Sequence, residues 1–493
     1  MNQYKIWYLS AEVSPFAKTG GLGDVTGALP KSLKTRNHEV RLIMPKYKMI
    51  NERKYILREV IRLKDIPVTL NGETKTVNVK SAFLPDSKVQ IYFVEIPELF
   101  GRNGIYGDNL TGEDFKDNPQ RFAYFCKAAL ETLKILSWRP DIIHCNDWHT
   151  AFVPIYLKSI FKNDQFFSGI KTVFTIHNFA FQGILSKDLA PVLDLDPEFY
   201  ESGQTLDFNG KINLVKGAIN CSDYITTVSE TYAREISTDP KFGYGLEKEL
   251  KKVSEKFAGI INGVDYTVWS PEHDKYIPFH FSSEDLSGKN QNKQALLTRA
   301  NLPFEENTPV FGMISRITEQ KGYGLLLQIL EDLLQLELMV VILGTGDKKL
   351  ESQLQKIQKK YPKKLSLNSA FDETLAHMVE AGSDFFLMPS SFEPCGMNQM
   401  YSLRYGTIPI IFKTGGLSET IQEIDAKEDN GNGFVFEKFN AKELLKAIRR
   451  GLRLYKNKDS WQKLIFRVMQ EDHSWEKPAD KYIETYKHIL NQS

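Results

Sequence analysis

A glycine-rich segment near the N-terminus carries the residue types of an anion site. Lys18-Thr19-Gly20-Gly21-Leu22-Gly23-Asp24 follows a short apolar run, Ile6 to Leu9, and precedes a helical pattern that begins near Gly27. Glycine lets a backbone approach a ligand closely, and a helix start offers N–H groups to an anion. The lysine adds a mobile cation, so the segment predicts a phosphate contact. It lacks the ending of a Walker loop, and Thr26 breaks a dinucleotide fingerprint. A simple tight turn would have the same composition.

Two cations and a carboxylate follow strand-like runs in the second half. Arg316 and Lys321 lie five positions apart after Val310–Ile314. Arginine offers phosphate a bidentate fork and lysine offers it a point charge, although a solvated charged loop has the same composition. Glu393 stands between an aromatic residue and a proline after Phe385–Met388. Its carboxylate can accept hydrogen bonds from sugar hydroxyls.

Polar residues also end two strand-like runs of the first half, and a second glycine turn follows later. Asn146-Asp147-Trp148-His149 comes after Asp141–Cys145, and His177-Asn178 comes after Thr172–Ile176. Thr414-Gly415-Gly416-Leu417 directly precedes an expected helix, which predicts another anion site. Taken singly, each of these residues is also typical of a cap or a structural turn.

These residues need a sheet that brings strand ends together. Short apolar runs alternate with amphipathic helical patterns, which predicts parallel sheets. The expected strands are Lys5–Leu9, Glu39–Met44, Val89–Glu95, Asp141–Cys145, Thr172–Ile176, Tyr224–Val228, Val310–Ile314, Leu338–Leu343, Leu365–Asn368, Phe385–Met388, Ile408–Phe412 and Phe434–Phe436. The expected helices include Gln120–Leu136, Lys211–Asn220, Ser229–Ile236, Gly324–Leu334, Leu350–Lys360, Glu373–Ala381, Asn398–Tyr405, Ser418–Ile424 and Lys442–Tyr455.

The pattern predicts two doubly wound α/β domains, with ligands at the carboxyl ends of both sheets. The proline-containing stretch from Asn262 to Ser287 is the expected connection, and Lys46 to Leu84 is expected to form meandering strands. A last helix, Ala479 to Leu490, suits either domain. Asp194-Leu195-Asp196 has the form of a metal motif but does not follow a strand, so we interpret it as structural.

The charge balance and the cysteines limit the classes of binding partner and bound metal that we expect. Lys+Arg 63 against Asp+Glu 62 leaves a formal net charge of +1 over 493 residues, which gives no reason to expect nucleic acid or a membrane surface as a partner. Cys126, Cys145, Cys221 and Cys395 form no Cys-x-x-Cys pair, so no disulfide framework or zinc site is indicated, and a cytoplasmic protein is expected. No residue cluster has metal-ligand spacing, and no cofactor is expected.

Together these motifs resemble those of bacterial glycogen synthase, a family shared with plant starch synthases. Besides the segments above, Asn262-Gly263-Val264-Asp265 and the continuation of Glu393 as Pro394-Cys395-Gly396 match in order, and the resemblance covers nearly the whole chain. It implies an α/β GT-B fold, with two Rossmann-like domains facing a deep cleft. It also implies a metal-independent, retaining glucosyltransferase that lengthens an α-1,4-glucan from ADP-glucose.

The resemblance also implies domain bounds and residue roles. Residues 1–260 would form a glucan-acceptor domain, 261–275 a linker, 276–472 a nucleotide-sugar domain and 473–493 a helix returning to the first domain. Arg316 and Lys321 resemble the family's pair on the diphosphate, and Glu393 resembles the acid that holds the donor glucose. His177 and Asp147 resemble the groups that line the anomeric centre. The expected substrate-binding residues are Lys18, Gly20, Gly21, Asp24, Asn178, Asn262, Cys395, Gly396, Thr414, Gly415, Gly416 and Leu417.

The chain departs from the family's usual residues at a few places: Asn146, Ser391, Met397-Asn398 and Lys413. The nucleotide of the donor therefore stays open between ADP-glucose and UDP-glucose. A nicotinamide dehydrogenase or an inactive glucan-binding protein could also have two Rossmann-like domains. Broken fingerprints speak against the first, and the presence of Arg316, Lys321 and Glu393 speaks against the second.

Overall fold

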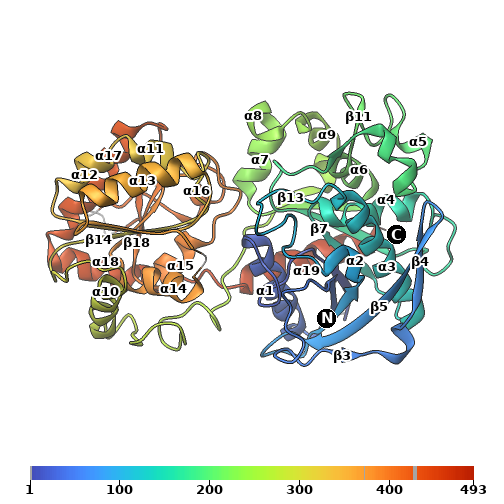
Figure 1. Ribbon diagram of the computed structural model, residues 1–493, viewed down its shortest axis with the longest axis horizontal. Coiled ribbons are helices and arrows are strands. Elements are labelled where there is room, and N and C mark those ends of the chain that lie inside the picture. Colours follow the sequence, from blue (N-terminus) through green and yellow to red (C-terminus); the bar gives the residue numbers. More distant parts are fainter. Residues whose placement is uncertain (1–2, 371, 426–429, 493) are drawn as a thin grey trace. The chain divides into compact units, whose positions relative to one another are not determined.

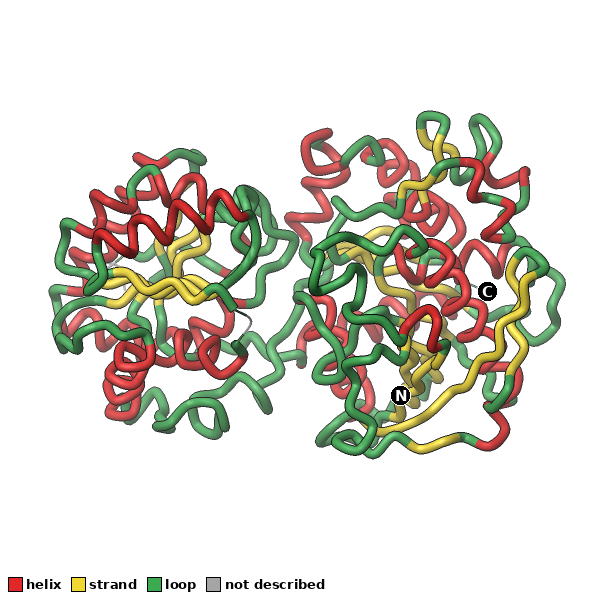
Figure 2. Tube along the Cα trace, in the orientation of Figure 1, coloured by secondary structure: helices red, strands yellow, loops and turns green. Residues whose placement is uncertain are grey.

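The computed structural model describes residues 3–370, 372–425 and 430–492. The chain divides into two units, one made of Met1–Gly263 with Trp475–Ser493 and the other of Val264–Ser474. Each unit is built around a sheet covered by helices (Figures 1 and 2). Within the described part of the chain, no helix has both the length and the apolar character that crossing a membrane requires.

The sheet of the first unit has the strand order β13-β12-β8-β7-β1-β2-β6-β5-β3, with β4 paired to β5. The pairs from β13 to β6 are parallel, and those that involve β3, β4 or β5 are antiparallel. The strands are β1 (Lys5–Leu9), β2 (Glu39–Pro45), β3 (Arg58–Glu59), β4 (Ile66–Leu70), β5 (Glu73–Phe83), β6 (Gln90–Glu95), β7 (Ile142–Asn146), β8 (Lys171–Ile176), β12 (Tyr224–Thr227) and β13 (Phe257–Gly259). A separate small sheet holds β9 (Ile184–Leu185), β10 (Asp207–Phe208) and β11 (Lys211–Asn213).

Within the described residues, the helices of this unit lie between its strands along the chain, except for the C-terminal helix. They are α1 (Gly21–Thr35), α2 (Pro97–Phe100), α3 (Asn118–Leu136), α4 (Phe152–Lys158), α5 (Pro197–Tyr200), α6 (Leu214–Cys221), α7 (Glu230–Thr238), α8 (Pro240–Gly243), α9 (Glu247–Lys252) and α19 (Glu476–Asn491). The C-terminal α19 belongs to this unit, where the hydroxyl of Tyr486 lies 2.7 Å from Nδ1 of His144 in the middle of β7.

The sheet of the second unit is parallel, with the order β16-β15-β14-β17-β18-β19. Its strands are β14 (Val310–Ile314), β15 (Met339–Leu343), β16 (Leu365–Asn368), β17 (Phe385–Met388), β18 (Ile408–Phe412) and β19 (Phe434–Phe436). Its helices are α10 (Ser287–Arg299), α11 (Tyr323–Leu327), α12 (Leu330–Leu334), α13 (Lys348–Lys360), α14 (Glu373–Gly382), α15 (Asn398–Arg404), α16 (Leu417–Thr420), α17 (Ala441–Tyr455) and α18 (Lys458–Met469). Helices α11, α12 and α13 cover one face, and α10, α14 and α15 cover the other (Figure 1).

Several sequence-based element bounds were wrong. The first helix begins at Gly21 and not near Gly27, because the glycines at its start weaken the helical pattern in the sequence although the backbone there is helical. The expected helix Lys211–Asn220 is a strand as far as Asn213, whose side chain then caps α6. Gly324–Leu334 is divided into α11 and α12, and Ser418–Ile424 is reduced to the short α16. The segment from Lys46 to Leu84 contains β3, β4 and β5, which extend the sheet edge.

Candidate functional site

At the carboxyl end of β7 and β8, the structure brings Asn146, Asp147 and His177 together. Asn146 ends β7 and lies opposite Thr175 in the parallel pairing with β8. Oδ1 of Asp147 accepts a hydrogen bond of 2.7 Å from the backbone N–H of His177, and Nε2 of His177 lies 2.9 Å from Oδ1 of Asn146. Asp147 has φ +57, a strained value for a non-glycine residue. The backbone at Asp147 thus directs its carboxyl group from the end of β7 toward the end of β8.

Burial sets the protonation states at this edge. Desolvation raises the pKa of Asp147 to about 7, although backbone hydrogen bonds from His177 and Asn178 act in the opposite direction. Burial also lowers the pKa of His177 to about 3, so its imidazole is neutral at pH 7. The edge therefore presents a neutral imidazole beside a carboxyl group that titrates near neutrality.

The glycine-rich loop meets α1 at its first turn. Gly20 is the N-cap residue, and a Cβ built on it meets nothing within 4 Å, so the space beside it is open. Gly23 is required by packing, because a Cβ there would lie 2.5 Å from Cβ of Lys18. The ammonium of Lys18 forms an ion pair of 3.0 Å with Asp24 in the first turn of the helix. The predicted cation and the predicted glycine turn thus lie together.

Glu12 organises this loop, and it was not predicted from the sequence. Its Oε2 accepts the N–H of Thr19 at 2.5 Å, and its Oε1 accepts the hydroxyls of Thr19 at 2.8 Å and Tyr106 at 2.6 Å. Glu12 is only 3% exposed, and burial raises its pKa. Its seven-residue distance from Thr19 is no motif in itself. Only the fold shows that this carboxylate holds the loop.

In the second unit, Lys321 and Glu393 form a pair in a pocket. Nζ of Lys321 lies 2.6 Å from Oε2 of Glu393, and the side chains are 19% and 11% exposed. Both residues line a pocket of about 50 Å³, together with Met313, Ile314, Ser315, Leu387, Met388, Ser390, Gly396, Met397 and Asn398. The pocket lies at the carboxyl ends of β14 and β17, the edge where a parallel sheet binds ligands.

The second glycine turn packs directly on the Glu393 segment. Gly415 has φ +44, and a Cβ built on it would lie 1.9 Å from the carbonyl oxygen of Glu393. A Cβ on Gly416 would lie 2.3 Å from the carbonyl oxygen of Cys395. Both positions therefore need glycine. Cys395, Thr414 and Leu417 are buried, and Oγ1 of Thr414 is enclosed without a hydrogen-bond partner among the described residues.

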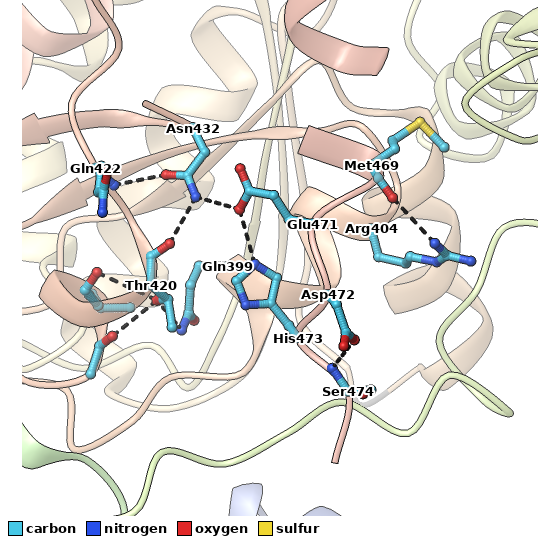
Figure 3. Close-up of polar contacts among 12 residues, drawn as sticks. Gln399, Arg404, Thr420, Gln422, Asn432, Met469, Glu471, Asp472, His473 and Ser474 are labelled. Carbon is cyan, nitrogen blue, oxygen red and sulfur yellow. Dashed lines mark hydrogen bonds and ion pairs between the residues drawn. The ribbon is translucent and has the colours of Figure 1, made fainter. Parts of the chain in front are cut away.

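A polar network that includes Gln399, Thr420, Asn432 and Glu471 lies next to this turn (Figure 3). Nε2 of Gln399 donates to the carbonyl oxygen of Gly396 at 3.1 Å and to Oγ1 of Thr420, the last residue of α16, at 3.1 Å. Nδ2 of Asn432 donates to the carbonyl oxygen of Thr420 at 2.9 Å and to the carboxylate of Glu471 at 2.7 Å. The network holds α16, which follows the glycine turn, against the Gly396 segment, and no sequence motif predicts these side chains.

The remaining predicted residues are more dispersed. Arg316 is exposed on the loop after β14 and does not line the Lys321 pocket. Asn262 is 5% exposed, and its Oδ1 is enclosed without a hydrogen-bond partner in the described ranges. The carboxylate of Asp194 pairs with Lys127, which is a structural role. Residues 3–370, 372–425 and 430–492 hold no group of His, Cys, Asp or Glu suited to a metal ion.

Comparison with known proteins gives matches along nearly the whole chain. Residues 5–252 match the family described as the starch synthase catalytic domain, and residues 296–465 match the glycosyl transferases of group 1. Glycogen synthase 2 of Geobacter metallireducens is 43% identical over 98% of both chains, and the glycogen synthase of Thermosipho africanus is 41% identical over 99% of both.

Two solved structures are also similar. The catalytic domain of starch synthase IV from Arabidopsis thaliana, solved with ADP and acarbose bound, has a TM-score of 0.91 and 34% identity, and the match covers 99% of this chain and 100% of that one. A sucrose-phosphate synthase from Thermosynechococcus elongatus has a TM-score of 0.60 and 15% identity, with full coverage of both chains, a likeness of fold alone.

Proposed function

Because this chain belongs to the glycogen and starch synthase family and has its two-unit α/β GT-B fold, we propose that it transfers glucose from ADP-glucose to the non-reducing end of an α-1,4-glucan. Transfer occurs with retention of the α configuration. The starch synthase IV structure with ADP and acarbose supports the nucleotide and the glucan as the two substrates.

The observation that carries this proposal is the pairing of Lys321 with Glu393 in one pocket, beside the glycine turn. Lys321 supplies the charge that a diphosphate needs, and the carboxylate of Glu393 can accept hydroxyl hydrogens of the glucose. The glycine turn packs on the same segment, where the N–H of Gly416 donates to the carbonyl oxygen of Glu393 at 3.2 Å. Arg316, exposed after β14, adds a second, bidentate cation for the phosphates.

The cations act on the leaving group. As the bond from the anomeric carbon to the diphosphate breaks, negative charge grows on the phosphate oxygens. Cations fixed before the reaction stabilise this charge more in the transition state than in the ground state. In the structure, Lys321 and Lys18 are each held by a carboxylate, Glu393 and Asp24. Donor binding would replace these carboxylates with phosphate oxygens, or add the phosphate as a second partner.

The first unit would bind the acceptor glucan. Asp147 and His177 stand at one sheet edge with Asn178 beside them, and the neutral imidazole can line the reacting sugar without adding positive charge. No carboxylate is assigned as a covalent nucleophile. We favour attack on the same face that the leaving phosphate departs from, with the phosphate accepting the proton of the acceptor hydroxyl. The Gly20 and Gly21 turn and Lys18 then supply further donor contacts.

The donor assay tests the proposal. The full chain is incubated with glycogen and either ADP-[14C]glucose or UDP-[14C]glucose, and label in precipitated glucan is counted. We expect incorporation from ADP-glucose to be at least tenfold faster. Faster transfer from UDP-glucose would show that UDP-glucose is the donor of the same transfer reaction, whereas no incorporation from either donor would refute the function.

The four cysteines are buried and form no disulfide within the described ranges, which suits the cytoplasm as the place of this reaction.

A further inference from the structure

A buried amide group sits between three strand ends of the first unit. Asn146 is fully enclosed, and its Nδ2 donates a hydrogen bond of 2.8 Å to the carbonyl oxygen of Leu9, the last residue of β1. A carbonyl oxygen only accepts, so the amide nitrogen must face Leu9 and the amide oxygen must face the other side. The orientation of the Asn146 side chain is therefore fixed by β1.

The amide oxygen of Asn146 has two neighbours on that other side. The hydroxyl of Tyr8 lies 3.2 Å away and Nε2 of His177 lies 2.9 Å away. An amide oxygen has two lone pairs and no hydrogen, so both neighbours must donate. Nε2 of His177 therefore carries a proton.

This assignment leaves one nitrogen of His177 as an acceptor. Burial lowers the pKa of His177 to about 3, so the ring is neutral at pH 7 and carries only the Nε2 proton. Its Nδ1 makes no hydrogen bond within the described ranges, and it is not among the polar atoms that the protein encloses completely. Since 8% of the residue is exposed and Nδ1 is not fully enclosed, a ligand hydroxyl can reach this nitrogen.

We propose that Asn146 is a positioning residue that sets the tautomer of His177, so that Nδ1 is presented as a neutral acceptor to a hydroxyl of the bound sugar. The role toward the sugar rests on the proposed function, whereas the tautomer does not. The opposite tautomer would place two lone pairs, on Oδ1 of Asn146 and on Nε2, against each other at 2.9 Å. The ring would also point an N–H at the sugar in place of an acceptor.

Among the described residues, Nε2 of His177 has no hydrogen-bond partner besides Asn146. The ionisable groups near the ring are Asp147, whose carboxyl accepts the backbone N–H of His177, and His144, whose own nitrogens are held by Tyr486 and Thr175. The hydroxyl of Tyr8 donates to the same Oδ1 of Asn146 and makes no hydrogen bond to the imidazole of His177. The removal of Asn146 thus leaves Nε2 without its acceptor, and the removal of the Tyr8 hydroxyl does not.

Nitrogen NMR of the full chain labelled with 15N-histidine tests the inference at pH 7 without substrate. The His177 signals are identified by their loss in His177→Gln. We expect a protonated Nε2 and a bare Nδ1 in the wild type, a mixture of both tautomers in Asn146→Leu, and the wild-type pattern in the matched control Tyr8→Phe. Asn146→Asp, which adds a negative charge beside Nε2, should raise the pKa of His177 and make the ring titrate at a higher pH.

Activity is measured in parallel. We expect Asn146→Leu to lower kcat/KM for glucosyl transfer about tenfold, the usual scale for the loss of one buried hydrogen bond, and Tyr8→Phe to stay within about twofold of wild type. A protonated Nδ1 in the wild type, or a pure Nε2–H tautomer in Asn146→Leu, would overturn the inference. The first of these needs no Asn146 variant, only His177→Gln to identify the signals. The expected tautomers without any glucosyl transfer would support the inference and refute the proposed function.

Discussion

Replacing Lys321 with alanine should separate catalysis from stability. Nζ of Lys321 lies 2.6 Å from Oε2 of Glu393 in a pocket whose two side chains are 19% and 11% exposed. If this ammonium stabilises the leaving diphosphate, its loss removes one preorganised charge from the transition state. Such a loss typically lowers turnover by on the order of 10²-fold, or about 2.7 kcal/mol of activation free energy. The free energy of unfolding should fall by less, about 1–2 kcal/mol, since the ion pair is only partly buried.

The assay compares initial rates with ADP-glucose and glycogen, together with urea unfolding of the same samples. Lys446→Ala is the matched control, because Lys446 forms an ion pair of 2.8 Å with Glu443 on α17, where the side chains are 54% and 28% exposed. It should leave turnover unchanged and alter the free energy of unfolding by less than about 0.5 kcal/mol. Wild-type turnover in Lys321→Ala would refute the role of this cation. So would a loss of activity that unfolding of the variant fully explains.

Three further outcomes follow from the structure. Glu12→Leu removes the oxygens that accept the N–H of Thr19 and the hydroxyls of Thr19 and Tyr106, so KM for the donor should rise several-fold, and an unchanged KM would contradict the role of Glu12. Burial lowers the pKa of His144 to about 3 in the folded protein, against 6.5 in the unfolded chain. The neutral buried ring therefore contributes fully to stability above pH 6.5, and this contribution is lost as the pH falls toward 3. The wild type should therefore lose about 2 kcal/mol relative to His144→Gln between pH 7 and pH 5, measured by urea unfolding, and a constant difference would refute this. Gly415→Ala drives a methyl group onto the carbonyl of Glu393, so it should lower the free energy of unfolding by about 2 kcal/mol or more and weaken donor binding, and a wild-type melting temperature would contradict the close packing.

The parallel strands could be predicted because their apolar runs are short and bounded by polar residues. Val310–Ile314 and Phe385–Met388 have the bounds expected from the sequence, and Asp141–Cys145 is displaced by a single residue from β7. Since polar residues just after such strands lie at one edge of the sheet, the neighbourhood of Asp147 and His177 followed from the pattern. The family comparisons confirm the fold class and the membership that the ordered motifs indicated.

Other features could not be predicted, because they depend on contacts between distant residues. Tyr8 and Asn146 are 138 positions apart in the sequence and meet only through the pairing of β1 with β7. Glu12 is part of no sequence motif, and its role is visible only in the folded chain, where it accepts hydrogen bonds from Thr19 and Tyr106. The first helix was expected too late, because glycines weaken the helical pattern at its beginning although the backbone there is helical.

The stereochemistry of the product tests the central claim most directly. The full chain is incubated with ADP-[1-13C]glucose and a maltooligosaccharide, and the labelled anomeric carbon is followed by NMR while ADP release is measured. We predict one ADP for each glucose added and label only in new α-1,4 linkages at the non-reducing end. A β linkage would contradict retention, and release of ADP with free glucose as the only labelled product would contradict the transfer itself.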